Sequence, residues 1–185
     1  EPNRGTFVDE RDGQEYKYTT IGDQVWMAQN LNYNLRFSMC YDNDSANCAI
    51  YGRLYPLWEN GRIGENFDRN LADSACPAGW HLPSKSEWEM MMIVMGGIEV
   101  EDAATRLKVP GAWDGAKWSK GTDVCGFSAI PSGEYYSSSF HALEYRLIFW
   151  TATLKFENIA YKVEISRIMA LGADLGVNSI RCVKD

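Results

Sequence analysis

The sequence lacks the features that would assign it to a membrane-spanning or nucleic-acid-binding class. It has no apolar run of about 18 residues, the length that a bilayer-spanning helix needs. It opens with EPNRGTF, without the charged start and apolar core of a signal peptide, which suits a mature chain. Basic residues are in the minority, 18 against 25 acidic ones, and the formal net charge is −7. Because a sequence-independent grip on phosphates needs clustered Lys and Arg, we do not expect nucleic acid among the partners.

Motifs for metal-dependent or nucleophilic chemistry are also missing. There are only two histidines, His81 and His141, and none of the five cysteines forms a CxxC pair. Zinc and thioredoxin-like chemistry are therefore not favoured. The sequence has no Ser/His/Asp order, no phosphate-cradling glycine loop and no paired carboxylates in a convincing context. It predicts a protein that is not an enzyme and that carries no cofactor.

Aromatic residues, by contrast, are abundant. Seven Trp and ten Tyr are many for 185 residues, whereas 45% apolar and 23% charged residues are ordinary for a folded globule. A chain of this length fits one domain, and we expect residues 1–185 to form a single one. Either its core or a binding face should be rich in aromatic rings.

Five cysteines indicate an oxidising compartment if they pair. Four can be paired by position: Cys40 with Cys48 around a short Asn/Asp loop, and Cys76 with Cys182 across most of the chain. Cys125 is then left over.

The order of predicted elements favours an α+β fold. Residues of about 5–30 indicate a β meander, because Asp12-Gly13 and Gly22-Asp23 are hairpin dipeptides between β-branched and aromatic residues. Residues 31–60 are predicted to be loop-like. The last third contains LIFWTAT, IAYKVEIS, RIMALG and VNSIRCV, which predict four strands in succession. Such segregation places the helices on one side of an antiparallel sheet.

Two main helices are predicted between these strands. The strongest signal is the capping box of Ser84 and Glu87, which starts a helix over 85–95 that Gly96-Gly97 ends. Its apolar stripe is more typical of core packing than of a cofactor site and comprises Trp88, Met91, Met92 and Met95. Helical spacing also predicts a helix near 67–75, and EDAATRLK can add a further turn. Residues 110–145 are expected to form a long structured loop.

Several quoted segments together carry a family likeness. They are DERDGQEYKYTTIGDQVWMAQNLNY, CYDNDSANCAIYGRLY, ACPAGWHLPSKSEWE, GFSAIPSGEY, FWTAT and SIRCVKD. In this order and spacing the chain resembles the Fibrobacter succinogenes major paralogous domain. That family looks like a branch of the C-type lectin-like fold, with antiparallel sheets, two helices and long structured loops. It is related at a distance to the formylglycine-generating sulfatase-modifying domain.

The resemblance also implies where particular residues lie. Cys76 would be tied through Cys182 to the final strand, so that Trp80 and His81 lie at the junction of that strand with the helix layer. His81 is then expected to be a structural histidine. Cys125 departs from the family pattern, and we expect it to be a free, buried thiol.

The long loop supplies the side chains that a sugar site uses. Flat rings stack on pyranose faces while carboxylates and amides bond the hydroxyls. The candidate ligand-binding residues are Trp113, Trp118, Glu134, Tyr135, Tyr136, His141 and Tyr145. The alternative for the two tryptophans is that they fill the core and fix the loop.

The loop CYDNDSANC is a candidate calcium site. Asp42, Asp44 and Asn47 offer hard oxygen donors at short spacing. The alternative is an ordinary turn, in which Asx side chains bond their own backbone.

Together these observations predict a binding or adhesion module. The resemblance implies a protein that is secreted or held on the outer surface of a bacterium, for instance by lipid on a removed N-terminal segment. The expected partner is a polysaccharide or a cell-surface protein. One alternative is a structural or tip subunit of a surface assembly. Another is an oxidase like the sulfatase-modifying relatives, but Cys125 and Cys182 do not map onto the cysteine pair of those enzymes.

Overall fold

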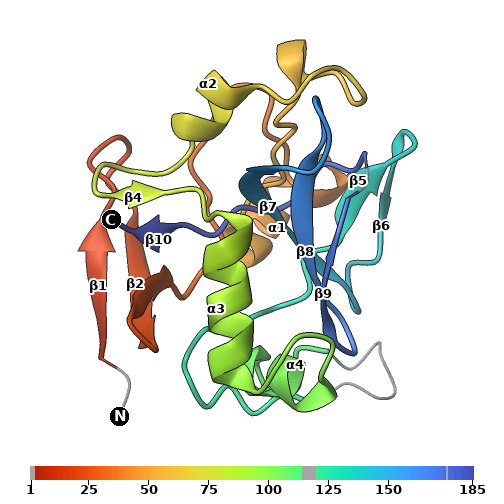
Figure 1. The fold of residues 1–185 in the computed structure, drawn as a ribbon. Coiled ribbons are helices and arrows are strands. Elements are labelled where there is room, and N and C mark those ends of the chain that lie inside the picture. The colour runs from red at the N-terminus through yellow and green to blue at the C-terminus, as the bar shows by residue number, and fades with distance from the viewer. Residues whose placement is uncertain (1–2, 114–119, 174) are drawn as a thin grey trace.

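The computed structural model describes residues 3–113, 120–173 and 175–185, and it has an α+β architecture. Three antiparallel sheets form its framework: one of five strands, one of three and a two-stranded hairpin. Figure 1 shows the five-stranded sheet at one side and the three-stranded sheet at the other, with the longest helix running beside both.

The five-stranded sheet joins the two ends of the chain. It contains β1 (Arg4–Val8), β2 (Glu15–Ile21), β3 (Gln24–Met27), β10 (Val183–Lys184) and β4 (Trp80–His81), in that order. The first three strands confirm the predicted meander, since β1 and β2 pair from Arg4 with Thr19 to Val8 with Glu15. Strand β10 pairs with β3 on one side and with β4 on the other, so the C-terminal strand lies inside this sheet and β4 is an end strand.

The second sheet comes from the last third of the chain. It contains β7 (Leu147–Leu154), β8 (Ala160–Ile165) and β9 (Met169–Gly172), which are the first three of the four predicted strands. The fourth segment behaves differently: residues 177–179 form only isolated bridges, and the chain then enters the other sheet as β10. Within the predicted long loop lies a hairpin of β5 (Glu134–Tyr136) and β6 (Ser139–His141).

The prediction of two helices is wrong, because the described residues contain four. Helix α3 (Lys85–Met95) has the predicted bounds and both hydrogen bonds of the capping box. Helices α2 (Arg69–Asp73) and α4 (Glu101–Leu107) lie where shorter helical segments were indicated. Helix α1 (Ser45–Tyr51), preceded by the 3-10 turn η1 (Tyr41–Asn43), was missed, since its Asp- and Asn-rich start resembles a loop. A second 3-10 turn is η2 (Glu59–Gly61).

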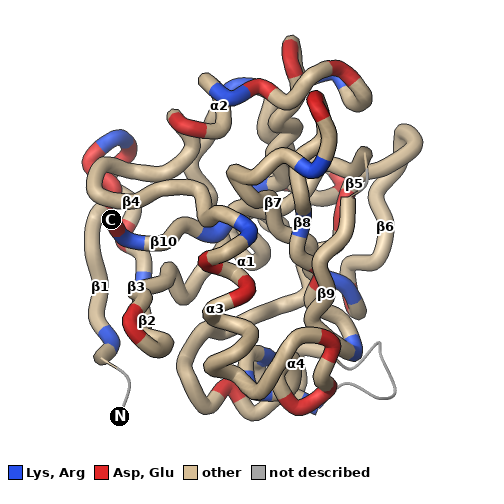
Figure 2. Tube along the Cα trace, in the orientation of Figure 1, with Lys and Arg blue, Asp and Glu red and all other residues tan. Residues whose placement is uncertain are grey.

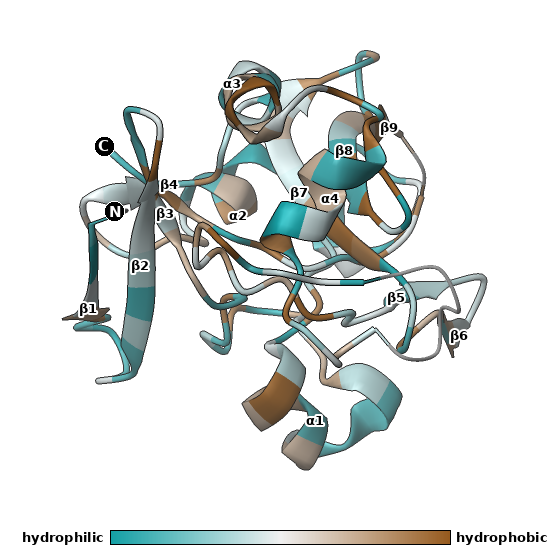
Figure 3. Ribbon diagram, turned by 90° about the horizontal axis from the view of Figure 1, so that it is seen from below, coloured by the Kyte–Doolittle hydropathy of each residue, from teal (hydrophilic) through white to brown (hydrophobic). Residues whose placement is uncertain are grey.

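The helices also do not share one side of the sheets. Figure 3 shows α3 and α1 at opposite sides of the molecule, with strands between them. Helix α3 packs against β7 and β8. The predicted apolar stripe of α3 is buried in full, which confirms its core role: Trp88, Met91, Met92 and Met95.

Much of the aromatic content lies in the core. The Trp88 ring lies 4.5 Å from that of Trp26 and is stacked on Phe149 at 5.1 Å. A second cluster surrounds the long disulfide and places the rings of Trp58 and Trp150 5.4 Å apart. These rings join the sheets to each other, and aromatic pairs of this kind contribute about 0.5–1.5 kcal/mol beyond the area they bury.

Both predicted disulfides are present, Cys40–Cys48 and Cys76–Cys182. Cys125 is a free cysteine and is buried, as expected. Burial raises the pKa of its thiol, which keeps it in the less reactive protonated form. Charged residues of both signs are distributed along the whole trace (Figure 2). None of the helices in the described ranges is long and apolar enough to cross a membrane.

Candidate binding surfaces

The β5–β6 hairpin brings most of the predicted ligand-binding residues together. Tyr136 and Tyr145 expose 47% and 52% of their surface, and His141 is also exposed. Tyr135 is half-buried, because its ring packs edge-on against Phe140 with 4.9 Å between centroids. The hairpin therefore offers the accessible ring of Tyr136 and the exposed His141, and Tyr145 is exposed in the segment that follows it.

Hydrogen bonds hold the polar groups of this hairpin in place. The Nε2 atom of His141 lies 2.7 Å from Ser139 Oγ and 3.2 Å from the Tyr136 carbonyl oxygen. Glu134 is buried, and its carboxylate accepts a hydrogen bond from Arg146 at 2.7 Å. Arg146 also pairs with Glu164. Glu134 thus anchors the hairpin to β8 through Arg146, which pairs with both carboxylates.

The two tryptophans of the predicted site do not lie on this surface. Trp113 is only 1% exposed, and its indole N–H donates to the Ala129 carbonyl at 3.0 Å. This buried ring fills the core, as the alternative proposed, and leaves no face for a ligand. Trp118 lies outside the described residues.

The Asp/Asn loop is a helix start. Asp44 is the N-cap of α1 and accepts from the backbone N–H of Ala46 at 2.9 Å. Asn47 donates from its side chain to the Tyr41 carbonyl, and Asp42 has a positive φ of 53°. The turn interpretation accounts for these contacts. Residues 3–113, 120–173 and 175–185 hold no group of three His, Cys, Asp or Glu side chains suited to a metal ion, and calcium here stays a prediction.

His81 lies at the predicted junction of the final strand with the helix layer. Its Nδ1 atom lies 2.7 Å from Asp185 Oδ1, and its Nε2 atom lies 2.8 Å from Glu87 Oε1. The other oxygen of Glu87 accepts from the backbone and hydroxyl of Ser84. One imidazole therefore connects β4, the start of α3 and the C-terminal residue, which is a structural arrangement.

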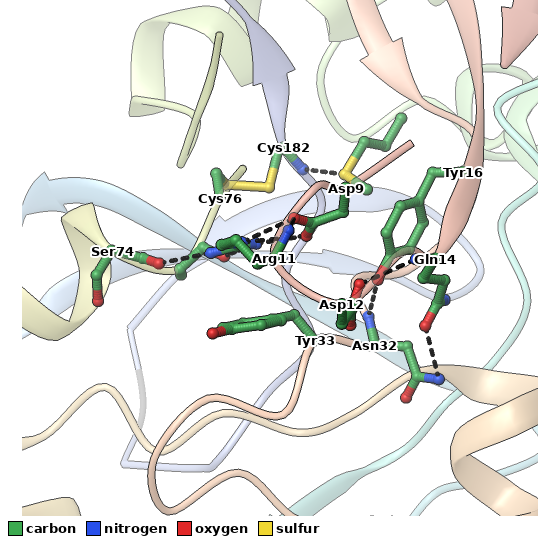
Figure 4. Close-up of polar contacts among 12 residues, drawn as sticks. Asp9, Arg11, Asp12, Gln14, Tyr16, Asn32, Tyr33, Ser74, Cys76 and Cys182 are labelled. Atoms are coloured by element: carbon green, nitrogen blue, oxygen red, sulfur yellow. Dashed lines mark hydrogen bonds and ion pairs between the residues drawn. A yellow bond between two sulfur atoms is a disulfide. The ribbon is translucent and has the colours of Figure 1, made fainter. Parts of the chain in front are cut away.

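A second polar cluster holds the β1–β2 hairpin against the corner of the chain just before Cys76 (Figure 4). Arg11 forms a bidentate pair with the fully buried Asp9 and donates to the carbonyls of Ser74 and Ala75. Its guanidinium lies 3.8 Å above the Tyr33 ring. Burial by itself raises the pKa of Asp9, but the hydrogen bonds from Arg11 outweigh it and lower the pKa. The cluster lies beside the Cys76–Cys182 disulfide in Figure 4. We call these contacts of Arg11 the Arg11 clamp.

Sequence reasoning missed a groove built from distant segments. A cavity of about 190 Å³ lies between the segment after β3, helix α1 and Arg181. A hollow of about 380 Å³ lies between β1, β2 and residues 123–128. The two adjoin, since Ala28 and Ser128 line both. No local motif could reveal this groove, because its walls come from segments as far apart in the sequence as Gln14 and Arg181.

Arg181 is the least expected residue of this groove. It is fully buried, and its guanidinium donates to the carbonyl of Phe127 and to Asn30 Oδ1. The group also stacks on the Phe127 ring at 4.3 Å. Burial lowers the pKa of Arg181 to about 9, so it stays protonated at neutral pH. Its Nε atom has no hydrogen-bond partner within the described part of the chain.

The fold and these sites define a disulfide-bonded α+β domain, and the comparisons place it in a family. The chain matches the Fibrobacter succinogenes major domain over residues 19–184. Because the match covers most of the chain, the protein belongs to this family, which confirms the resemblance of the sequence motifs. Comparison with curated proteins and with solved structures yields no match.

Proposed function

We propose that this domain is a binding or adhesion module of the C-type lectin-like class, acting outside the cell on a polysaccharide or another envelope ligand. The observation that carries the proposal is the pair of exposed tyrosines, Tyr136 and Tyr145, on and beside the β5–β6 hairpin. Phenol rings stack on the apolar face of a sugar, and the adjoining His141 and Ser139 can bond its hydroxyls. The two disulfides support an oxidising, extracellular setting.

A structural subunit of a surface assembly is the alternative. Strand β1 is an end strand of the five-stranded sheet, and an end strand offers backbone groups for pairing with another chain. Catalysis is not part of the proposal. Four of the five cysteines form disulfides and Cys125 is buried, which does not favour the oxidase alternative.

A glycan array tests the binding proposal. We expect the protein to bind at least one saccharide, and Tyr136→Ala to weaken that binding roughly 5- to 150-fold, because a stacked ring contributes about 1–3 kcal/mol. Stability should change little, since the ring is exposed. Phe156→Ala is the matched control, because Phe156 is 59% exposed but lies between β7 and β8.

Two outcomes would contradict the hairpin as the binding site. One is unchanged binding by a Tyr136→Ala, Tyr145→Ala double variant. The other is an array without any binding together with a protein partner that copurifies through β1, which would favour the structural alternative.

A further inference from the structure

The groove beside Arg181 has the lining of a saccharide site. Four amide side chains border its inner cavity: Gln14, Gln29, Asn30 and Asn32. Amides can both donate to and accept from sugar hydroxyls. The half-buried Tyr18 lines the outer hollow and offers a ring beside them. Two adjoining hollows suit a chain of units better than a single small molecule, and the outer one falls within the roughly 300–1,000 Å³ of typical ligand sites.

The backbone shapes the inner cavity at Gly52. This residue has a positive φ of 74°, and a Cβ there would meet Asn30 Cβ and the Leu31 carbonyl at 2.8 Å. Only glycine lets the end of α1 come this close to the segment after β3. The cavity wall is therefore set by chain packing and does not depend on long, mobile side chains.

The charge in the groove opposes that of the whole chain. Arg4 and Lys17 are exposed on its outer rim, and Arg181 lies at its inner wall. None of the three forms an ion pair with a carboxylate in the described residues. Asp123 is the acid that lines the outer hollow, and its oxygens already accept from the backbone and hydroxyl of Ser128. Three cations thus gather in a molecule with a net charge of −7.

Arg181 and Asn32 each retain an unused polar atom. Arg181 Nε and Asn32 Oδ1 are buried without a hydrogen-bond partner within the described ranges. Asp123 favours the charge of Arg181 through space, but no carboxylate of the described residues forms an ion pair with it. An anion in the adjoining cavity would further stabilise this buried cation. A carboxylate in the cavity would act on Arg181 through its charge, because the guanidinium is fully buried and already donates to Phe127 and Asn30.

We propose that this groove binds an acidic polysaccharide, with hexuronic acid carboxylates held by Arg4 and Lys17 and favoured by the charge of Arg181, and hydroxyls held by Gln14, Gln29 and Asn32. The inference rests on the proposed saccharide-binding function for its ligand class, but it concerns a different site from the β5–β6 hairpin. Arg181 is buried in the wall of the inner cavity, and its charge would favour the carboxylate of a unit bound there. Arg4 and Lys17 would hold the units that follow along the outer hollow.

A charge placed at the cavity rim tests the proposal. Ala49 is exposed on α1 and lines the inner cavity. We expect isothermal titration to show binding of an oligogalacturonate and at least tenfold weaker binding of a neutral gluco-oligosaccharide of equal length. Ala49→Glu should weaken oligogalacturonate binding at least tenfold by repelling its carboxylates, whereas the matched neutral variant Ala49→Gln should stay within threefold of the parent.

Charge removal at the rim gives an independent measurement that does not depend on buried residues. An Arg4→Gln, Lys17→Gln double variant should weaken oligogalacturonate binding at least tenfold. Lys155→Gln, which removes an exposed cation between β7 and β8, should have no effect. Equal binding of neutral and acidic oligomers, or an equal loss in Lys155→Gln, would overturn the proposal.

Tyr136→Ala separates the two sites. If it abolishes binding of neutral saccharides but leaves oligogalacturonate binding intact, both proposals stand. If oligogalacturonate does not bind at all while array binding depends on Tyr136, the groove proposal fails and the hairpin proposal survives.

Discussion

At the scale of single residues, His81 shows how one titratable side chain joins three segments. Burial by itself lowers its pKa, but the hydrogen bonds to Asp185 and Glu87 outweigh burial and raise the pKa above the ordinary value of 6.5. For Glu87, burial by itself raises the pKa, while the bonds from Ser84 and His81 lower it below 4.5. Both groups are therefore charged together in the window from about pH 4.5 to the raised pKa of His81.

The first stability prediction concerns this window. Because the folded-state pKa of His81 is raised, its contribution is complete below about pH 6.5 and is lost as the pH rises through the raised pKa. His81→Gln should lower the free energy of unfolding by less than about 1 kcal/mol near pH 6, since the ring is part-exposed and screened. Urea unfolding from pH 5 to 9 should show the difference shrinking at high pH.

His141→Gln is the control for the loss of an imidazole. Its Nε2 atom contacts Ser139 Oγ and the Tyr136 carbonyl, not a carboxylate. A difference between His81→Gln and the parent that stays constant up to pH 9 would show that the pair with Glu87 and Asp185 carries no charge-dependent stability.

At the scale of elements, local signals decided what the sequence could predict. Helix α3 was predicted with its bounds because Ser84 and Glu87 cap it within four residues and its apolar stripe has helical spacing. Helix α1 was missed because its cap, Asp44, lies in an Asx-rich stretch, and nothing in that stretch distinguishes a cap from a turn. The groove could not be predicted at all, because Arg181 and Asn30 meet only in the folded chain.

The second stability prediction separates the cap from a calcium ligand. Asp44→Ala should lower the free energy of unfolding by about 1 kcal/mol, because it removes the hydrogen bond to the Ala46 N–H. Asp44→Asn should keep most of that stability, since asparagine caps equally well. Adding a chelator to the parent should leave its melting temperature unchanged. A fall with chelator, together with loss in Asp44→Asn, would favour calcium, because a bound ion stabilises the folded state by mass action.

At the scale of the whole molecule, the Cys76–Cys182 disulfide joins the middle of the chain to its end. The final strand β10 enters between β3 and β4, and the disulfide fixes the residue just before it. Arg11 contacts the carbonyls of Ser74 and Ala75, just before Cys76, and His81 contacts Asp185, just after β10. This convergence explains why the segment around ACPAGWHLP carries so many specialised residues, although neither the clamp nor the bridge to Asp185 was visible in the sequence.

The last prediction compares the two disulfides. They close loops with sequence separations of 106 and 8. In the chain-entropy model the longer loop contributes about 4.7 kcal/mol and the shorter one about 2.6 kcal/mol. The double variant that carries Cys76→Ala and Cys182→Ala should therefore lose about 2 kcal/mol more free energy of unfolding than the double variant that carries Cys40→Ala and Cys48→Ala. Urea unfolding measures both losses. Each double variant keeps the other disulfide intact and has Cys125 as its one free thiol. If both variants lose the same stability, the corner at Cys76 is held chiefly by packing and by the Arg11 and His81 contacts, and the covalent link to the final strand is not what secures it.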